Sequence, residues 1–238
     1  VGDIALSVDA LADALGSKLD LDLRDFEKVR DNVKKEIYRL DDEPAFPMRP
    51  QHIVSEIRNL MGYHDIIALD NGVYKIWFAR NYLAFQPNTI LLDNALATMG
   101  AGLPSAMLAA MIHPNRKVMS ICGDGGFMMN SQELETAVRL DLNLVVLILN
   151  DSSYGMIRWK QAGGGFKDWG LEYENPDIVK YAEAYGAHGH RISSVTGFVE
   201  TIDRAYREGG VHVVDLPVDY SQNVKELITD LRDHKPIV

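Results

Sequence analysis

The 238-residue sequence predicts an α/β fold, a doubly wound parallel sheet with helices on both faces, preceded by a short helical tail. Three observations support this prediction. From Asp65 onward, short apolar runs alternate with helical patterns. The runs are continuously apolar, as expected for parallel strands that are buried on both faces. Glycine and proline stand where the helical patterns begin and end.

The predicted elements follow one another in the order that this fold requires. Strands are expected at residues 65–70, 88–93, 117–122, 142–150 and 211–216, with a further short one at 188–192. Helices are expected at residues 73–83, 102–112, 131–140, 177–186 and 196–210. Asn175 and Pro176 predict an N-cap and a first helical position, and Gly186 and Gly209 predict helix ends.

The amino-terminal residues have a different pattern. One helical face carries a row of apolar side chains, which we expect to pack against the α/β domain: Leu23, Phe26, Val29, Val33, Ile37 and Leu40. Residues 43–50 contain three prolines and predict an extended connector. We therefore expect residues 1–45 to be the tail and linker of a preceding domain, and residues 46–238 to be the main domain. The chain begins with Val1, so it is expected to be a fragment of a longer polypeptide.

Composition excludes several classes of function. A net charge of −10 argues against nucleic acid as the main partner. No apolar run reaches the roughly 18 residues of a membrane span, and no secretory signal is visible. The single cysteine, Cys122, fits a reducing compartment, so a cytoplasmic location is expected. Cys122 is expected to pack as a small apolar residue rather than to act as a nucleophile.

Two aspartates follow two successive predicted strands. Asp124 comes just after residues 117–122, and Asp151 comes just after residues 142–150. If these strands are neighbours, both carboxylates lie at the edge where ligands bind in a doubly wound sheet. Two carboxylates and a backbone carbonyl suit Mg2+, which completes its shell with phosphate oxygens and water. The alternative is that both aspartates merely begin surface turns.

The residues after Asp124 favour a phosphate ligand. Gly125 and Gly126 let the backbone approach a ligand closely. Asn130 and Glu133 have the spacing of a helix N-cap and its partner, and the N–H groups of that helix would face the ligand. No GxxxxGK[ST] motif is present, and the Gly-Asp-Gly run lacks the third glycine of a nicotinamide-binding fingerprint. The sequence therefore predicts a Mg2+–diphosphate site.

The spacing of this segment resembles the thiamine diphosphate motif. Gly123-Asp124-Gly125 is followed, after 24 intervening residues, by Asn150-Asp151, where the family has Asn-Asn. The replacement by aspartate keeps an oxygen ligand. The surrounding sequence, over roughly residues 46–225, resembles acetolactate synthases, especially the catabolic, FAD-independent type. The resemblance rests on the segments DNGVYKIWFAR, DNALATMGAGLPSAMLAA, SQELETAVRLDLN, NDSSYGMIRWKQ and PVDYSQN.

The resemblance implies a role for particular residues. Asp124, Asp151 and the backbone carbonyl of Ser153 would hold Mg2+. Met99 would prop thiamine diphosphate into its bent form, and the carbonyl of Ala97 would accept a hydrogen bond from its aminopyrimidine. The other implied cofactor-binding residues are Gly72, Val73, Tyr74, Gly123, Gly125, Gly126, Phe127, Tyr154, Gly155 and Met156. The implied substrate side consists of Met156, Ile157 and Lys160.

The resemblance also implies an activity, the decarboxylation of pyruvate and its condensation with a second pyruvate to 2-acetolactate. Lys160 departs from the anabolic, FAD-containing synthases, which usually have tryptophan at that position. A 2-oxo acid decarboxylase, another carboligase of the superfamily, a cofactor-binding subunit without activity of its own, and a phosphate-binding module unrelated to thiamine remain alternatives. Gly163, Gly164 and Gly165 are hypothesised to hinge a lid.

The family's activating glutamate belongs to an N-terminal pyrimidine-binding domain, usually of another subunit. No segment of this chain resembles that domain, so we expect no catalytic residue here, weak cofactor binding and no turnover by the chain alone. That domain, in the same or a partner chain, and a small 2-oxo acid are the expected partners. A homodimer or tetramer is expected, with its buried contact at the apolar helices around Met99 and Trp77. Trp77 itself is expected to serve packing rather than chemistry.

Overall fold

The computed structural model describes residues 2–16, 22–37 and 45–229. These residues fall into two compact units, the first containing residues 2–16 and 22–37 and the second residues 45–229. The first unit consists of helices α1 (Ile4–Leu15) and α2 (Arg24–Ile37). Asp3 caps α1, because its carboxylate accepts a hydrogen bond from the backbone N–H of Leu6 at 3.0 Å. The predicted domain boundary at residue 45 stays a prediction.

Helix α2 carries most of the apolar face predicted for residues 23–40, and the described side chains of this face are exposed. The side chains of Leu23, Phe26, Val29 and Val33 are all exposed. The packing of this face against the α/β domain stays a prediction. The side chain of Ile37 and all of Leu40 lie outside the described residues.

The second unit is built on a six-stranded sheet with the order β2-β1-β3-β4-β6-β5. Every neighbouring pair of strands is parallel, which confirms the predicted parallel sheet. The short strand expected at residues 188–192 is present as β5. The strands are β1 (Ile66–Leu69), β2 (Ile90–Leu92), β3 (Val118–Gly123), β4 (Leu144–Asn150), β5 (His188–Arg191) and β6 (Val211–Pro217).

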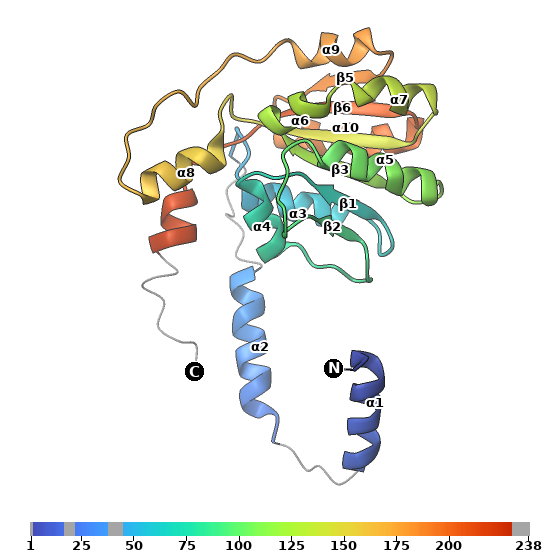
Figure 1. The fold of residues 1–238 in the computed structure, drawn as a ribbon, viewed down its shortest axis with the longest axis vertical. Helices are drawn as coiled ribbons and strands as arrows, with labels where there is room; N and C mark the ends of the chain where they lie inside the picture. Colours follow the sequence, from blue (N-terminus) through green and yellow to red (C-terminus); the bar gives the residue numbers. More distant parts are fainter. Residues whose placement is uncertain (1, 17–21, 38–44, 230–238) are drawn as a thin grey trace. The chain divides into compact units, whose positions relative to one another are not determined.

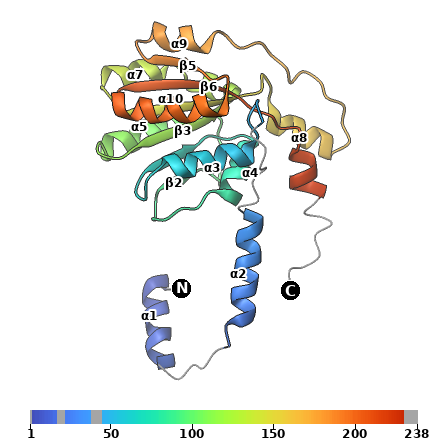
Figure 2. The same cartoon turned by 180° about the vertical axis from the view of Figure 1, so that it is seen from behind.

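Helices cover both faces of the sheet, as predicted (Figures 1 and 2). On one face the core includes Trp77 and Phe198, and on the other it includes Phe127 and Leu134. The first face is covered by α3 (Pro50–Leu60), α4 (Tyr74–Asn81) and α10 (Val195–Glu208). The second face is covered by α5 (Gly102–Ile112), α6 (Asp124–Asn130), α7 (Glu133–Arg139) and α9 (Ile178–Ala184). Helix α8 (Gly155–Gly163) follows β4, and the described part ends in a π-helix (Lys225–Thr229).

Two helix starts differ from the prediction. Helix α6 already begins at Asp124, so Asn130 ends a helix instead of capping the next one, and its side-chain amide donates to the carbonyl of Gly100 at 2.8 Å. Helix α6 was not expected because two glycines near its start have a low helix propensity. Burial of Phe127 stabilises the helix nevertheless. Helix α9 is capped by Asp177, whose carboxylate accepts from the N–H of Lys180, and not by Asn175.

Besides α6, which was not predicted, helices α3 and α8 are absent from the prediction. The proline-rich stretch expected to be an extended connector ends in α3, which has Pro50 in its first turn. Helix α8 has no fully buried residue, and Met156 and Trp159 are partly buried against the core, so its apolar face spans about a single turn. The helix predicted at residues 102–112 is confirmed with the same bounds as α5.

Cys122 is free and buried at the end of β3, and burial raises the pKa of its thiol. This confirms its predicted packing role, since the thiolate is the reactive form of cysteine. Trp77 is a core residue whose indole N–H donates to Asn223 Oδ1 at 2.9 Å. Among the described residues, no helix combines the length and the hydropathy of a membrane span.

Candidate functional site

The order of the strands creates a switch point between β1 and β3. The chain leaves β1 for β2 on one side and returns to β3 on the other, and ligands of doubly wound sheets bind outside the carboxyl ends of the strands at such a point. Strands β3 and β4 are in register there, with Gly123 opposite Leu149. Asp124 and Asp151 therefore emerge at the same edge of the sheet, as the sequence predicts for neighbouring strands.

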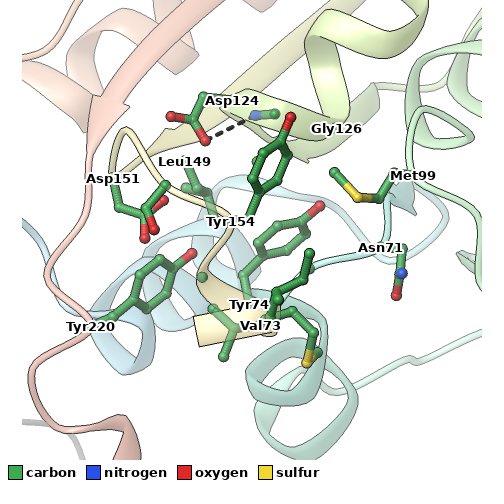
Figure 3. Close-up of a pocket in the computed structure, with 17 residues that line it drawn as sticks. Asn71, Val73, Tyr74, Met99, Asp124, Gly126, Leu149, Asp151, Tyr154 and Tyr220 are labelled. Atoms are coloured by element: carbon green, nitrogen blue, oxygen red, sulfur yellow. Dashed lines mark hydrogen bonds between the residues drawn. The ribbon is translucent and has the colours of Figure 1, made fainter. Parts of the chain in front are cut away.

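A cavity lies at this edge, and Figure 3 shows the side chains that line it. Its walls come from the loop after β1, the start of α6 after β3, and the segment that leads from β4 into α8. Most of the residues that the resemblance implies line this cavity: Gly72, Val73, Tyr74, Met99, Gly123, Asp124, Gly125, Gly126, Asp151, Ser153, Tyr154, Gly155, Met156 and Ile157. It is also lined by Asn71, Leu149 and Tyr220, which sequence reasoning did not select.

Three of the implied residues do not line the cavity. Ala97 is exposed, and its carbonyl accepts a hydrogen bond from Asn71 Nδ2 at 3.3 Å. Phe127 is buried in the core. Lys160 is exposed in the last turn of α8. The roles implied for these three residues stay predictions.

The electrostatics of the site favour a cation. Asp124 is only 1% exposed, and Asp151 lies beside it on the cavity wall. Burial, together with the negative charge of Asp124, raises the pKa of Asp151 from its usual 3.8 to about 7, while Arg158 acts in the opposite direction. Two carboxylates that repel each other in a partly buried site are both ionised most readily when a metal ion lies between them.

The donor set fits Mg2+ held jointly by protein and phosphate. Within the described ranges, no cluster of three or more His, Cys, Asp or Glu side chains could hold a metal ion. A metal ion bound here would take its remaining ligands from backbone carbonyls, phosphate oxygens or water, which is the usual arrangement for Mg2+. Ser153 is nearly buried on the cavity wall, and its Oγ has no hydrogen-bond partner among the described atoms.

Side chains from outside the predicted set hold Asp124 in place. The hydroxyl of Tyr173 donates to Asp124 Oδ1 at 2.9 Å, and the side-chain amide of Asn175 donates to Asp124 Oδ2 at 2.7 Å. The N–H of Gly125 also donates to Oδ1, at 2.9 Å. Sequence reasoning missed Tyr173 entirely and assigned Asn175 to a helix cap. The one sequence feature that singled out Asn175 was the proline that follows it, and this feature predicted a helix cap instead of a contact with Asp124.

The hydrogen bonds of Asn175 continue across the ends of the strands. Its amide also donates to Asn150 Oδ1 at 3.1 Å, and Asn150 Nδ2 in turn donates to Asp215 Oδ1 at 2.8 Å. Arg191 then bridges the buried Asp215, at 3.2 Å, and Asp177, at 3.1 Å. A continuous polar chain thus links the end of β3 with β4, β6 and β5 and ends in an ion pair on the surface.

A buried carboxylate fixes the other wall of the cavity. Asp70 follows β1, is 1% exposed, and accepts hydrogen bonds from the N–H groups of Gly100 at 3.0 Å and Ala101 at 3.1 Å. Burial raises its pKa, and these backbone hydrogen bonds oppose that rise. Asp70 thereby holds the loop that carries Met99 against the end of β1. Asp70 opens the segment DNGVYKIWFAR, but sequence reasoning assigned cofactor-binding roles only to Gly72, Val73 and Tyr74 of that segment.

Tyrosine rings fill much of the cavity. A Cβ atom on Gly72 would lie 2.2 Å from Tyr74 Cε1, and one on Gly125 would lie 2.8 Å from Tyr154 Cε1. The cavity has a volume of about 40 Å3. Figure 3 shows the rings of Tyr74, Tyr154 and Tyr220 around this cavity.

Comparison with known proteins identifies the family. Residues 70–216 match the family described as thiamine pyrophosphate enzyme, C-terminal TPP binding domain. This chain belongs to that family. The match covers the carboxyl edge from Asp70 to β6, and so includes both aspartates and the glycines between them. The chain is therefore a thiamine diphosphate-binding domain of a thiamine diphosphate-dependent enzyme.

Individual relatives are longer than this chain. It is 35% identical over 202 residues to an acetolactate synthase of Bacillus subtilis (strain 168), a match that covers 83% of this chain and 35% of that protein. It is 34% identical over 229 residues to a catabolic acetolactate synthase of Raoultella terrigena, covering 94% of this chain and 40% of that protein. The chain thus spans little more than a third of these relatives.

A solved structure confirms the fold. The thiamine diphosphate-dependent 4-hydroxybenzoylformate decarboxylase of Rhodococcus jostii RHA1 superimposes with a TM-score of 0.67 and 21% sequence identity. The superposition covers 72% of this chain and 33% of that one.

Proposed function

We propose that this chain is the cofactor-binding part of an enzyme that decarboxylates pyruvate and condenses it with a second pyruvate to 2-acetolactate, using thiamine diphosphate and Mg2+. One observation carries the proposal. Asp124 and Asp151 lie at the ends of two paired strands, with the Gly125-Gly126 turn beside them, in a chain that is 35% identical to an acetolactate synthase over 83% of its length.

The protein's task at this site is to bind and orient the cofactor. Asp124, Asp151 and the carbonyl of Ser153 would hold Mg2+, and the absence of side chains at Gly125 and Gly126 would let the diphosphate approach the backbone. Thiamine diphosphate, when bound, supplies the electron sink that decarboxylation of a 2-oxo acid requires. The cavity wall at Met99 would keep the cofactor bent.

The substrate side of the proposed site is the start of α8. Met156 and Ile157 line the cavity, and Lys160 lies one turn further along the same helix. We assign these three residues to the binding of a small 2-oxo acid. Gly163, Gly164 and Gly165 end α8, and the exposed Phe166 and Trp169 follow them. This placement supports a hinge that moves an apolar segment toward the site and excludes water.

The proposal includes a second domain. The chain spans 35–40% of the relatives described above, so the activating glutamate is assigned to an N-terminal pyrimidine-binding domain in the same or a partner chain. The proposed dimer or tetramer buries an apolar face. Leu108, Met111 and Ile112 of α5 are exposed and can supply it. Trp77 itself is buried in the core, and the contact expected at the helices around Met99 and Trp77 stays a prediction.

The test is to identify the product that the full-length protein makes from pyruvate with thiamine diphosphate and Mg2+. Acetolactate is the expected product. Acetaldehyde would assign the protein to the decarboxylases with the same site. No product, with the cofactor demonstrably bound, would mean that the substrate is wrong. The 238-residue chain by itself is expected not to turn over, and appreciable pyruvate consumption by that chain would refute the assignment of the glutamate to another domain.

A further inference from the structure

The carboxylate of Asp124 is held from both sides by the segment between α8 and α9. Tyr173 reaches Oδ1 and Asn175 reaches Oδ2, each within 3 Å. These two residues lie about 50 positions along the chain from Asp124, and they belong to neither of the strand ends that carry the aspartates. Nothing in the sequence motif assigns them a role.

The two carboxylate oxygens of Asp124 accept different numbers of hydrogen bonds. A carboxylate has two oxygens with about four lone-pair directions between them. Oδ1 accepts two hydrogen bonds, from the N–H of Gly125 at 2.9 Å and from the hydroxyl of Tyr173 at 2.9 Å. Oδ2 accepts one, from Asn175 at 2.7 Å. One lone pair therefore remains, and it is on Oδ2.

Tyr173 and Asn175 are themselves fixed on the loop that carries Asp151. The N–H of Tyr173 donates to the carbonyl of Ser152 at 3.2 Å, and the N–H of Tyr154 donates to the carbonyl of Leu171 at 3.1 Å. The rings of Tyr154 and Tyr173 lie 4.9 Å apart. The same short segment thus connects the loop after β4 with the carboxylate after β3.

We infer that Tyr173 and Asn175 are positioning residues that orient Asp124 as a monodentate metal ligand through Oδ2. This inference rests on the proposed function, because it takes Asp124 to be a metal ligand. Hydrogen bonds to a ligating carboxylate fix its orientation, and their loss typically weakens metal binding by about 10- to 100-fold. The hydroxyl of Tyr173 occupies Oδ1 and Asn175 restricts the rotation of the carboxylate, so that Oδ2 would be the atom that binds the metal.

The experiment measures the affinity of the full-length protein for Mn2+ in the presence of saturating thiamine diphosphate, by water proton relaxation. Tyr173→Phe keeps the ring and removes only the hydroxyl, and Asn175→Ala removes the amide. Tyr181→Phe is the matched control, because the hydroxyl of Tyr181 forms a hydrogen bond of 2.8 Å with Ser131, away from the site. Both site variants are expected to bind Mn2+ about 10-fold more weakly, and the control is expected to bind it like the wild type.

A second readout separates positioning from general damage to the structure. In the site variants, the Mn2+ concentration for half-maximal activity should rise while kcat at saturating Mn2+ stays within about two-fold of the wild type, since the ligands themselves remain. Wild-type Mn2+ affinity in both variants would overturn the inference alone. If the wild type binds no Mn2+ with thiamine diphosphate, the proposed function fails, and the inference fails with it.

Discussion

Asp70 and Gly126 are in such close contact that a Cβ atom on Gly126 would lie 2.2 Å from Asp70 Oδ2. The contact joins the end of β1 to the first turn of α6, on the two sides of the switch point. Asp70 also binds the N–H groups of Gly100 and Ala101. One buried carboxylate thus positions both the glycine turn after Asp124 and the loop of Met99.

Gly126→Ala is expected to destabilise the fold by about 1–3 kcal/mol, the usual cost of forcing an extra methyl group into a packed interior. The buried carboxylate of Asp70 cannot move away without losing its hydrogen bonds to the backbone. Unfolding in urea measures the change in free energy. Gly163→Ala is the control, because a Cβ atom there would have no neighbour within 4 Å. Equal stability of the two variants would contradict this account of the contact.

Asp70→Ala is expected to lower the free energy of unfolding by about 2–4 kcal/mol, because it leaves the buried N–H of Gly100 and the N–H of Ala101 without their acceptor. The measurement is again unfolding in urea. Asp203→Ala serves as the control: Asp203 is an exposed carboxylate paired with Arg207 on α10, and its loss should cost about 0.5 kcal/mol or less. A stability loss for Asp70→Ala as small as that of the control would mean that Asp70 does not hold the Met99 loop.

The stability of the metal-free protein is expected to depend on pH through Asp151. Its pKa is raised from 3.8 to about 7 in the folded state, so the folded state binds this proton more tightly than the unfolded state does. The protonated carboxyl therefore stabilises the fold at low pH. This contribution is lost progressively as the pH rises from about 4 to about 7, by up to roughly 4 kcal/mol.

The measurement compares the wild type with Asp151→Asn, each unfolded in urea at a series of pH values with a chelator present. Taking the difference between the free energies of unfolding of the two proteins cancels the contribution of the other titrating groups. Asp151→Asn should gain stability relative to the wild type as the pH rises through this range. A difference that does not change between pH 4 and pH 8 would show that the pKa of Asp151 is not raised.

The parts of the fold that depend on local pattern were predictable from the sequence. Parallel strands buried on both faces leave continuous apolar runs, and helix α5 has the bounds predicted for it, residues 102–112. The positions of Asp124 and Asp151 after successive strands were predictable, whereas their adjacency depended on the pairing of β3 with β4, which the sequence left as a condition and the structure shows.

The contacts made by residues distant in sequence were not predictable. Tyr173 and Asn175 reach Asp124 across about 50 residues of chain, and no periodicity encodes that approach. Asn175 was assigned to a cap because asparagine before proline is typical of a helix start, yet Asp177 caps α9 and leaves Asn175 free to bind Asp124. Helix α6 was missed for a related reason, since tertiary burial of Phe127 overrides the low helix propensity of two glycines.

The central claim is that Asp124 and Asp151 bind thiamine diphosphate through Mg2+. Its most direct test is calorimetric titration of the full-length protein with thiamine diphosphate, with and without Mg2+, in the wild type, Asp124→Asn and Asp151→Asn. The account predicts Mg2+-dependent binding by the wild type, tighter than the binding of inorganic diphosphate, and a loss of at least about 10-fold in both variants. Wild-type binding that is independent of Mg2+, or unchanged in both variants, would contradict it.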